Sequence, residues 1–226
     1  MRSTAGPRVF AHGVPPQALG QAIISGEYIP GKILPTELTA SERMGVYREV
    51  VQVLIAKGLV ESRTKTGARV LPRHRWNMLD PDVLEWAFAD TPDMQLLRSL
   101  FELRSAIEPY AARLAAKRRD DDDLRTIHDA LEMMADETLA TRAGQAADRA
   151  FHAAIIFATR NDAPTSLSSG ITAGVEWTTR LRQRDRALPR DPIPDHRRVY
   201  DAIHAADPDE AAAAMSSLVT LALDDI

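Results

Sequence analysis

The sequence predicts a mainly helical protein with two domains. The first is a winged helix-turn-helix, made of three helices and a β-hairpin wing, and the second is an all-helical bundle. Three observations support this: a basic two-stranded ribbon follows the helix signals of the first 73 residues, apolar positions beyond residue 93 recur at helical spacing, and the two parts differ in net charge. We therefore place the domains at 1–73 and 93–226, joined by a linker at 74–92.

Charge is distributed unevenly along this chain of 226 residues, whose formal net charge is −4. Residues 1–76 carry 11 Lys and Arg against 5 Asp and Glu, whereas residues 77–226 carry 17 against 27. A basic part joined to an acidic part is typical of a protein whose basic part meets a polyanion such as DNA. On charge alone, a solvated basic face explains the first part equally well.

Several protein classes are disfavoured by composition. No stretch approaches 18 consecutive apolar residues, so the sequence predicts no membrane span. The segment MRSTAGPRVF lacks the apolar stretch of a signal peptide, and we expect a cytoplasmic protein. The chain has no cysteine, which excludes disulfides and thiolate metal sites.

Helix signals divide the first 58 residues into three segments. The first helix is expected to start near Pro16, because Pro is tolerated in a first turn, and to end at Gly26. Thr36 caps a short second helix, and Gly45 makes the turn that follows it. A third helix, YREVVQVLIAKG, ends at Gly58 and would enter the major groove of DNA.

A basic hairpin follows in GLVESRTKTGARVLPRHRW, where five Lys or Arg stand against one Glu. Two short β-rich runs flank a Thr-Lys-Thr-Gly turn, in which Gly67 can supply a positive φ. A ribbon in this place is the wing, which contacts the DNA backbone or the minor groove. The candidate DNA-binding residues are Lys32, Arg43, Arg48, Lys65, Gly67 and Arg69.

The remainder is predicted to be helical near 94–118, 120–139, 143–159, 164–186, 194–206 and 208–224. Asp207-Pro208 is a clear helix start, with a capping Asp and Pro at the first helical position. The acidic run from Asp120 to Asp123 is interpreted as a helix cap that faces water. Four apolar residues in the linker favour a docked rather than a loose segment, namely Trp76, Leu79, Leu84 and Trp86.

Several separated segments resemble the GntR family of bacterial transcription regulators, among them GEYIPGKILPTE, AKGLVESRTKTGARV, ELRSAIEPYAARLAAKR and DRAFHAAIIFATRND. The later segments resemble its FCD group, whose second domain is a helical effector-binding bundle. RWNMLDPDVLEW is also similar to the linker of regulators that answer to galactonate and related sugar acids. The resemblance implies a homodimer that binds operator DNA, with repression as the favoured direction, and whose affinity changes when a small carboxylate binds.

The sequence departs from the family pattern at the third helix. Gly45-Val46 runs straight into Tyr47, and the stretch to Gly58 is about four residues short, roughly 6 Å of helix. No Ser, Thr, Asp or Asn stands at the expected N-cap. The missing turn would include the end that reaches base edges. Altered docking, an effector-binding dimer with impaired DNA binding, and a deletion variant all remain open.

Asp148 and His152 stand at i and i+4, so they share a helix face and can grip one ion or ligand. The resemblance places Asp148, His152 and His196 on three of the four ligands of the usual FCD metal site, and the fourth, a His, falls on Leu218. Three such ligands can still hold a divalent cation such as zinc, completed by water or by the carboxylate of the effector. A pocket without a metal is the equal alternative.

Arg104 lies on an apolar helix face and therefore needs a counter-charge. It either pairs with Glu108 or Glu102, or grips the carboxylate of the effector with its planar fork. The resemblance favours the effector. The full set of candidate effector-binding residues is Arg104, Asp148, His152, Asn161, Trp177, Arg180 and His196.

A metal-dependent hydrolase or lyase that uses Asp148, His152 and His196 is the alternative from another class, because three such ligands can activate a water. However, the sequence shows no separate general base, nucleophile motif or phosphate loop. An enzyme would also leave the basic winged domain unexplained. We therefore expect a regulator.

Overall fold

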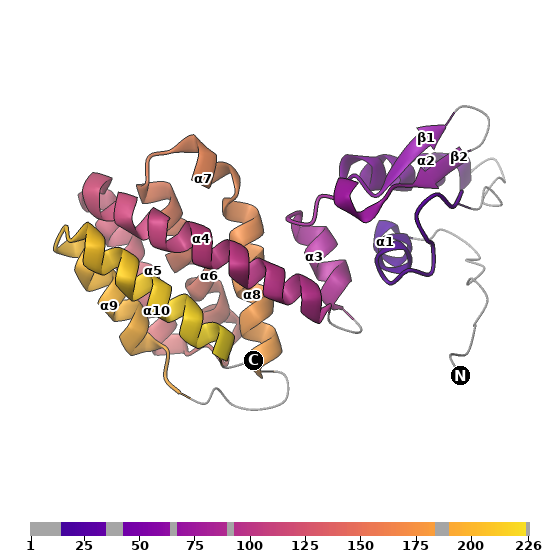
Figure 1. The fold of residues 1–226 in the computed structure, drawn as a ribbon. Coiled ribbons are helices and arrows are strands. Elements are labelled where there is room, and N and C mark those ends of the chain that lie inside the picture. Colours follow the sequence, from indigo (N-terminus) through magenta and orange to yellow (C-terminus); the bar gives the residue numbers. More distant parts are fainter. Residues whose placement is uncertain (1–14, 35–42, 64–66, 90–92, 184–189, 225–226) are drawn as a thin grey trace. The chain divides into compact units, whose positions relative to one another are not determined.

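The structure is a computed structural model that describes residues 15–34, 43–63, 67–89, 93–183 and 190–224. The chain divides into two units, residues 1–92 and 93–226 (Figure 1). Within the described residues, every helix is too short or too polar to cross a lipid bilayer.

Helix α1 (Pro16–Ile24) opens the first unit and agrees with the sequence prediction. Pro16 occupies the first helical position, where its missing N–H costs nothing. The helix ends ahead of Gly26, whose φ of +83° is a conformation that glycine adopts without strain. Leu19 and Ile23, one turn apart, form the buried face.

Helix α2 (Arg43–Ala56) differs from the prediction, because Gly45 lies inside it. The turn expected at Gly45 is wrong. A single glycine costs a helix only about 1 kcal/mol, and no Pro or capping side chain follows to separate two helices. The cap expected at Thr36 lies outside the described residues. Gly58, with φ +71°, ends this segment as predicted.

The predicted wing is present as an antiparallel hairpin of β1 (Val60–Arg63) and β2 (Gly67–Val70). Its register pairs Glu61 with Arg69 across the strands. The segment 31–34 runs along the free edge of β2, where the Leu34 N–H donates to the Ala68 carbonyl at 2.8 Å. The strand β2 is therefore hydrogen-bonded on both edges.

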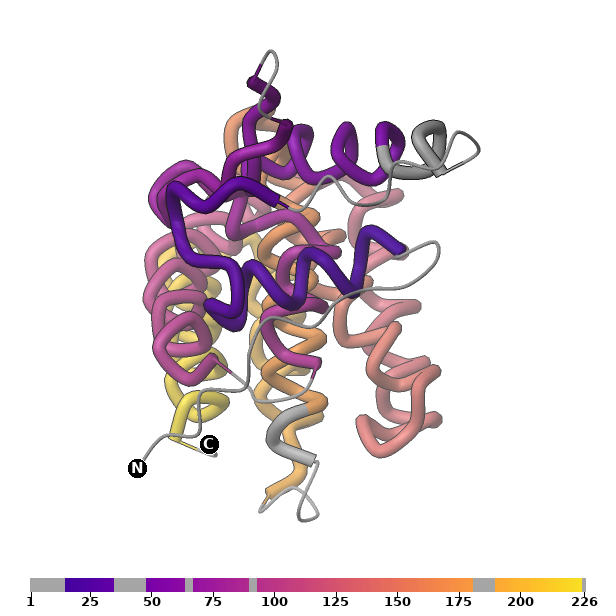
Figure 2. Tube along the Cα trace, turned by 90° about the vertical axis from the view of Figure 1, so that its right-hand side faces the viewer, coloured from indigo at the N-terminus to yellow at the C-terminus, as the bar shows by residue number. Residues whose placement is uncertain are grey.

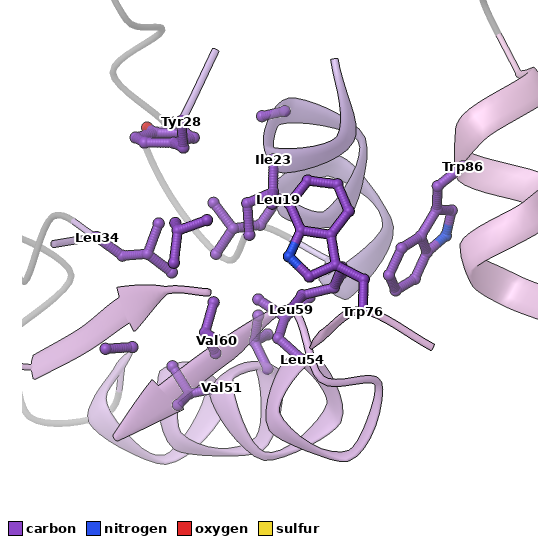
Figure 3. Packing of buried hydrophobic residues seen from close by; sticks show 14 of the residues in the cluster. Leu19, Ile23, Tyr28, Leu34, Val51, Leu54, Leu59, Val60, Trp76 and Trp86 are labelled. Carbon is purple, nitrogen blue, oxygen red and sulfur yellow. The ribbon is translucent and has the colours of Figure 1, made fainter. Parts of the chain in front are cut away.

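The expected linker carries structure of its own: a 3-10 turn, η1 (Arg73–Arg75), and helix α3 (Pro81–Phe88). Trp76 and Trp86 belong to the same buried cluster as Leu19, Ile23 and Leu54 (Figure 3). This part of the linker is therefore docked on the core of the first unit.

Two further contacts attach α3 to the first unit. A Cβ added at Gly20 would lie 2.2 Å from Cε3 of Trp86, so the indole fits only because α1 has no side chain there. The Lys57 ammonium, at the end of α2, donates to the Asp80 carboxylate at 2.7 Å. That carboxylate also accepts from the Asp82 and Val83 amides and so caps α3.

The second unit consists of helices in its described residues. They are α4 (Met94–Arg118), α5 (Asp121–Glu137), α6 (Arg142–Ala158), α7 (Asp162–Ser166), α8 (Ser168–Gln183), α9 (Ile193–His204) and α10 (Pro208–Asp224). α4 and α10 lie side by side in both views (Figures 1 and 2), and α5 packs on α6. This arrangement encloses α6 within the bundle, where it contacts α4, α5 and α8.

The caps predicted for this unit are present. Asp120 forms a capping box with Asp123 at the start of α5, and Asp207 accepts from the Asp209 and Glu210 amides at the start of α10. The single helix expected over 164–186 is instead divided at Leu167 into α7 and α8. The Ser166 hydroxyl there bonds to the Ala163 carbonyl, a local bond that competes with helix continuation.

Candidate functional site

Five ionisable side chains from three helices are enclosed in the second unit, and we call them the buried charge cluster. Each is at most 3% exposed. α4 supplies two of them, α6 two, and the first turns of α9 supply the fifth. The members are Arg104, Glu108, Asp148, His152 and His196. Because enclosed charges are costly, their contacts with each other decide what the site can hold.

The His196 ring is oriented by a backbone carbonyl. Its Nδ1 lies 2.8 Å from the carbonyl oxygen of Pro192, and its Nε2 lies 3.1 Å from Oδ1 of Asp148. A carbonyl oxygen can only accept, so Nδ1 carries the proton and donates it. The other nitrogen, Nε2, therefore faces the Asp148 carboxylate.

The His152 ring is oriented by a carboxylate. Its Nδ1 lies 2.6 Å from Oε2 of Glu108, and its Nε2 lies 3.6 Å from Oδ1 of Asp148. Both histidines therefore turn Nε2 toward the same carboxylate oxygen. Burial alone lowers the pKa of His152, but the charges of Glu108 and Asp148 outweigh it and raise this pKa to about 9.

The three inner atoms lie close enough together to share one metal ion. One ligand atom each of Asp148, His152 and His196 lies within 4.8 Å of the others. Two imidazole nitrogens and a carboxylate oxygen suit zinc and similar divalent cations. The outer nitrogen of each ring also faces a protein oxygen, the Pro192 carbonyl for His196 and the Glu108 carboxylate for His152, which is the usual support of a metal-binding histidine. The donor set fits a divalent cation.

Arg104 is paired inside the cluster. Its Nε donates to Oε1 of Glu108 at 2.6 Å, and its Nη1 donates to the Thr178 hydroxyl at 3.1 Å. Burial alone raises the pKa of Glu108, but Arg104 and His152 lower it to about 2. The counter-charge that the sequence demanded for Arg104 is therefore Glu108, one helical turn away.

A small cavity borders the cluster. It measures about 10 Å³, close to the space that one water molecule or ion occupies. Leu218 and Ala222 of α10 form its apolar wall, and Leu218 stands where the family resemblance places a fourth ligand. The polar lining consists of Arg104, Asp148, His152, Thr178, Thr179, Arg190 and His196.

Comparisons with known proteins agree with this architecture. Residues 99–221 match the FCD domain family. The chain is 34% identical over 206 residues to the galactonate operon transcriptional repressor of Escherichia coli K12, covering 89% of this chain and 90% of that protein. The solved structure of Streptococcus agalactiae GntR is 25% identical with a TM-score of 0.52, over 91% of this chain and 95% of that one.

This chain belongs to the GntR family of transcription regulators, in its FCD group. It is a regulator and not an enzyme, since its relatives are regulators throughout the matched length. The solved structure of Lar, which controls expression of the Listeria monocytogenes agr system, has the same fold at 17% identity, with a TM-score of 0.64 over 93% of this chain and 94% of that one.

In this GntR regulator, three residues expected at the effector site are not part of the cavity lining. The Asn161 side chain caps α7 by accepting from the Ala163 amide at 3.2 Å. Arg180 is exposed, and its guanidinium carbon lies 4.9 Å from the centroid of the Trp177 ring. It also pairs with Glu176. Arg104, Asp148, His152 and His196 do line the cavity.

Sequence reasoning missed three contacts of this regulator's cluster. The Thr179 hydroxyl donates to Oδ2 of Asp148 at 3.0 Å, and the Pro192 carbonyl holds His196. Neither has a sequence signal, because a threonine in a helix and a backbone carbonyl are too common to single out. The contact between Glu108 and His152 joins two helices and was also missed.

The candidate DNA-binding residues lie on the first unit of the regulator. Lys32 and Arg48 are exposed, and Gly67, with φ +90°, opens β2. Arg69 donates through Nε to Glu61 at 2.8 Å, and Arg63 donates to the same oxygen at 3.1 Å. These two bonds lower the pKa of Glu61. Lys65 and the side chain of Arg43 lie outside the described residues.

Proposed function

We propose that this protein is a homodimeric, cytoplasmic, operator-binding repressor whose affinity for DNA changes when a small carboxylate, such as a sugar acid, binds the second unit. The observation that carries the proposal is the 34% identity with a galactonate operon repressor, which extends over 89% of the chain and so includes both units. The buried charge cluster, enclosed within the matched FCD domain, supplies the chemistry that an anionic effector needs.

The effector site includes a divalent cation held by Asp148, His152 and His196. Support comes from the spacing of the three ligand atoms, all within 4.8 Å of one another. When bound, such a cation supplies a positive charge and an open coordination position for a carboxylate. Leu218 cannot fill that position, whereas a histidine could. The Glu108 carboxylate and the Pro192 carbonyl keep the His152 and His196 rings turned so that both Nε2 atoms face Asp148.

Effector binding requires the bundle to rearrange. The cavity of about 10 Å³ accommodates a water or an ion, and a sugar acid is many times larger. The apolar wall formed by Leu218 and Ala222 must therefore move when the effector enters. A ligand that binds one arrangement of helices better than another shifts the protein toward that arrangement. This requirement links the site to regulation.

The basic residues of the first unit hold the DNA backbone. Lys32, Arg48 and Arg69 are partly or fully exposed, and with Arg43 and Lys65 they provide phosphate contacts. Such contacts release counterions, so affinity should fall steeply as salt rises. A neutral replacement of Arg69 should weaken binding to all sequences alike, and a change confined to one base position would contradict the role.

The decisive experiment combines DNA selection with calorimetry. A DNA fragment is first selected from a random-sequence pool by the full-length protein. Galactonate, gluconate and neutral galactose are then titrated into the protein with and without that fragment. We expect the acids to bind and the neutral sugar not to, and the acid to change DNA affinity by the same factor as DNA changes acid affinity. Equal binding of galactose would refute the effector class.

The contribution of Arg104 is tested by Arg104→Lys, which keeps the charge but removes the planar fork. We expect weaker binding of the acid. Arg98→Lys is the matched control, since Arg98 is exposed on the same helix. Unchanged acid affinity in Arg104→Lys would show that the fork does not bind the effector.

Assembly as a dimer follows from the way winged domains read DNA, because one such domain covers a half-site only. Light scattering at micromolar concentration should give twice the chain mass of 24.9 kDa. A species of 24.9 kDa alone would count against it.

The continuity of α2 through Gly45 favours a second candidate, an effector-binding dimer with impaired DNA binding. In that case the first unit has lost the turn that presents a separate recognition helix. Inserting Ser-Arg-Thr-Val between Val46 and Tyr47 tests this idea. A large gain in specific DNA affinity supports it, and no gain contradicts the interpretation that the missing turn impairs DNA binding.

A further inference from the structure

We propose that Glu108 is a positioning residue for the cation site: it binds the outer nitrogen of His152 and thereby strengthens the inner nitrogen as a metal ligand. The proposal rests on the cation of the proposed function and names the residue that sets its affinity. Glu108 and His152 are 1% and 2% exposed, so water does not screen their contact.

The geometry separates this role from that of a ligand. Oε2 of Glu108 lies 2.6 Å from Nδ1 of His152, whereas the nitrogen that faces Asp148 is Nε2. Glu108 thus touches the side of the ring away from the other ligand atoms. Oε2 and Nδ1 form an ion-pair contact, and neither has a hydrogen-bond partner among the described residues, so each depends on the other.

The two histidines are supported unequally. His196 hydrogen-bonds a neutral carbonyl through Nδ1, whereas Nδ1 of His152 forms an ion-pair contact with a carboxylate. A carboxylate behind an imidazole fixes the tautomer, holds the ring plane and makes the opposite nitrogen more basic. His152 is therefore the stronger of the two nitrogen donors. Since Leu218 leaves the site with three ligands, the strength of each one matters more.

Arg104 acts through Glu108. Its Nε donates to Oε1 of Glu108 at 2.6 Å, so that Oε2 is left to contact His152. Its Nη1 reaches the Thr178 hydroxyl on α8. The chain of contacts from Thr178 through Arg104 and Glu108 to His152 therefore joins α8, α4 and α6. A carboxylate enclosed without the guanidinium would be too costly to keep ionised.

The test is a titration of metal-depleted, full-length protein with Zn²⁺ by calorimetry. Glu108→Gln should bind Zn²⁺ about 10- to 100-fold more weakly than wild type, the usual effect of removing such a support. Glu102→Gln is the matched control, because it makes the same change on the exposed face of α4. It should bind Zn²⁺ as wild type does. The visible absorption spectrum of bound Co²⁺ should shift in Glu108→Gln and not in the control.

A second variant guards against loss of folding. Glu108→Gln leaves Arg104 enclosed without its carboxylate, whereas Arg104→Met combined with Glu108→Gln removes both charges. The double variant should fold and bind Zn²⁺ as weakly as Glu108→Gln. Wild-type affinity in either variant overturns the role of Glu108 and leaves the cation site intact. Failure of the wild type to bind Zn²⁺ or Co²⁺ overturns both this inference and the cation of the proposed function.

Discussion

The two units place their charges in opposite ways. Among the described residues of the first unit, the only buried charged side chain is Lys57, at 8% exposed, and it pairs with Asp80 and Asp82. The second unit encloses the buried charge cluster, five ionisable residues at 3% or less. The first unit keeps its charges outside, where a large partner such as DNA can reach them. The second unit keeps its charges inside, where only a small ligand can reach them.

The energetic consequences also differ. An exposed pair such as Arg63 and Glu61 is screened by water and adds little stability, so a partner can replace it at little cost. Removing one member of an enclosed pair leaves the other charge buried and costs several kcal/mol. Substitutions of exposed charged residues in the first unit should therefore alter mainly binding, and those of the enclosed charged residues in the second should alter folding as well.

The largest effect is expected at Arg104. Arg104→Met leaves Glu108 enclosed without its partner and should lower the free energy of unfolding by about 3–5 kcal/mol. Urea denaturation measures this loss. The double variant Arg104→Met/Glu108→Gln should recover most of it. If the single variant is as stable as the double variant, the enclosure of charge does not distinguish the second unit.

The pH dependence sharpens the same contrast. The pKa of Glu108 falls from 4.5 to about 2 on folding, so its contribution is present above pH 4.5 and lost as pH falls toward 2. The pKa of His152 rises from 6.5 to about 9, so its contribution is full below pH 6.5 and lost as pH rises through 9.

Without metal, the second unit should therefore be most stable between about pH 4.5 and 6.5, and should lose on the order of a few kcal/mol by pH 9. Amide exchange in the presence of a chelator, corrected for the intrinsic rate, measures this for each unit. The first unit should change less over this range. Equal losses in both units would contradict the assignment of the effect to the cluster.

Two glycines give a smaller, opposite pair of effects. A Cβ at Gly20 would lie 2.2 Å from Trp86, whereas one at Gly174 would lie 3.8 Å from Leu100, an ordinary contact. Gly20→Ala should destabilise the first unit by about 1–3 kcal/mol. Gly174→Ala should stabilise α8 by about 0.5–1 kcal/mol. Thermal unfolding of the two variants against wild type gives both signs, and a stabilised Gly20→Ala would show that Trp86 does not dock there.

The smallest effect concerns the wing. Glu61→Gln removes the charge that Arg63 and Arg69 share, so these side chains become available to phosphates. DNA affinity should rise a few-fold, and the slope of log affinity against log salt should steepen by up to about 1. Glu85→Gln, on α3, makes the same change of charge as a control. If both variants gained equally in DNA affinity, the change in net charge alone would explain the effect.

Features that depend on neighbours in the sequence were predicted well. The segments expected at 94–118 and 208–224 agree with α4 and α10, because Pro208, the caps and the helical period are all local signals. The turn expected at Gly45 failed because one glycine is a weak signal against a helix that continues on both sides.

The candidate site was predictable only in part. The spacing of Asp148 and His152 places them on one helix face, and the family resemblance adds His196. The contact of Glu108 with His152 could not be predicted, because it depends on how α4 packs against α6. The size of the cavity likewise depends on how close Leu218 of α10 comes to the other helices.

The small size of the cavity also has a kinetic consequence. An effector larger than this space of about 10 Å³ enters only when the wall formed by Leu218 and Ala222 moves. Local openings of this kind take microseconds to seconds, far longer than ligand exchange at an open surface. The association rate of the effector would therefore report how often the bundle opens, and the regulator can respond no faster than this opening.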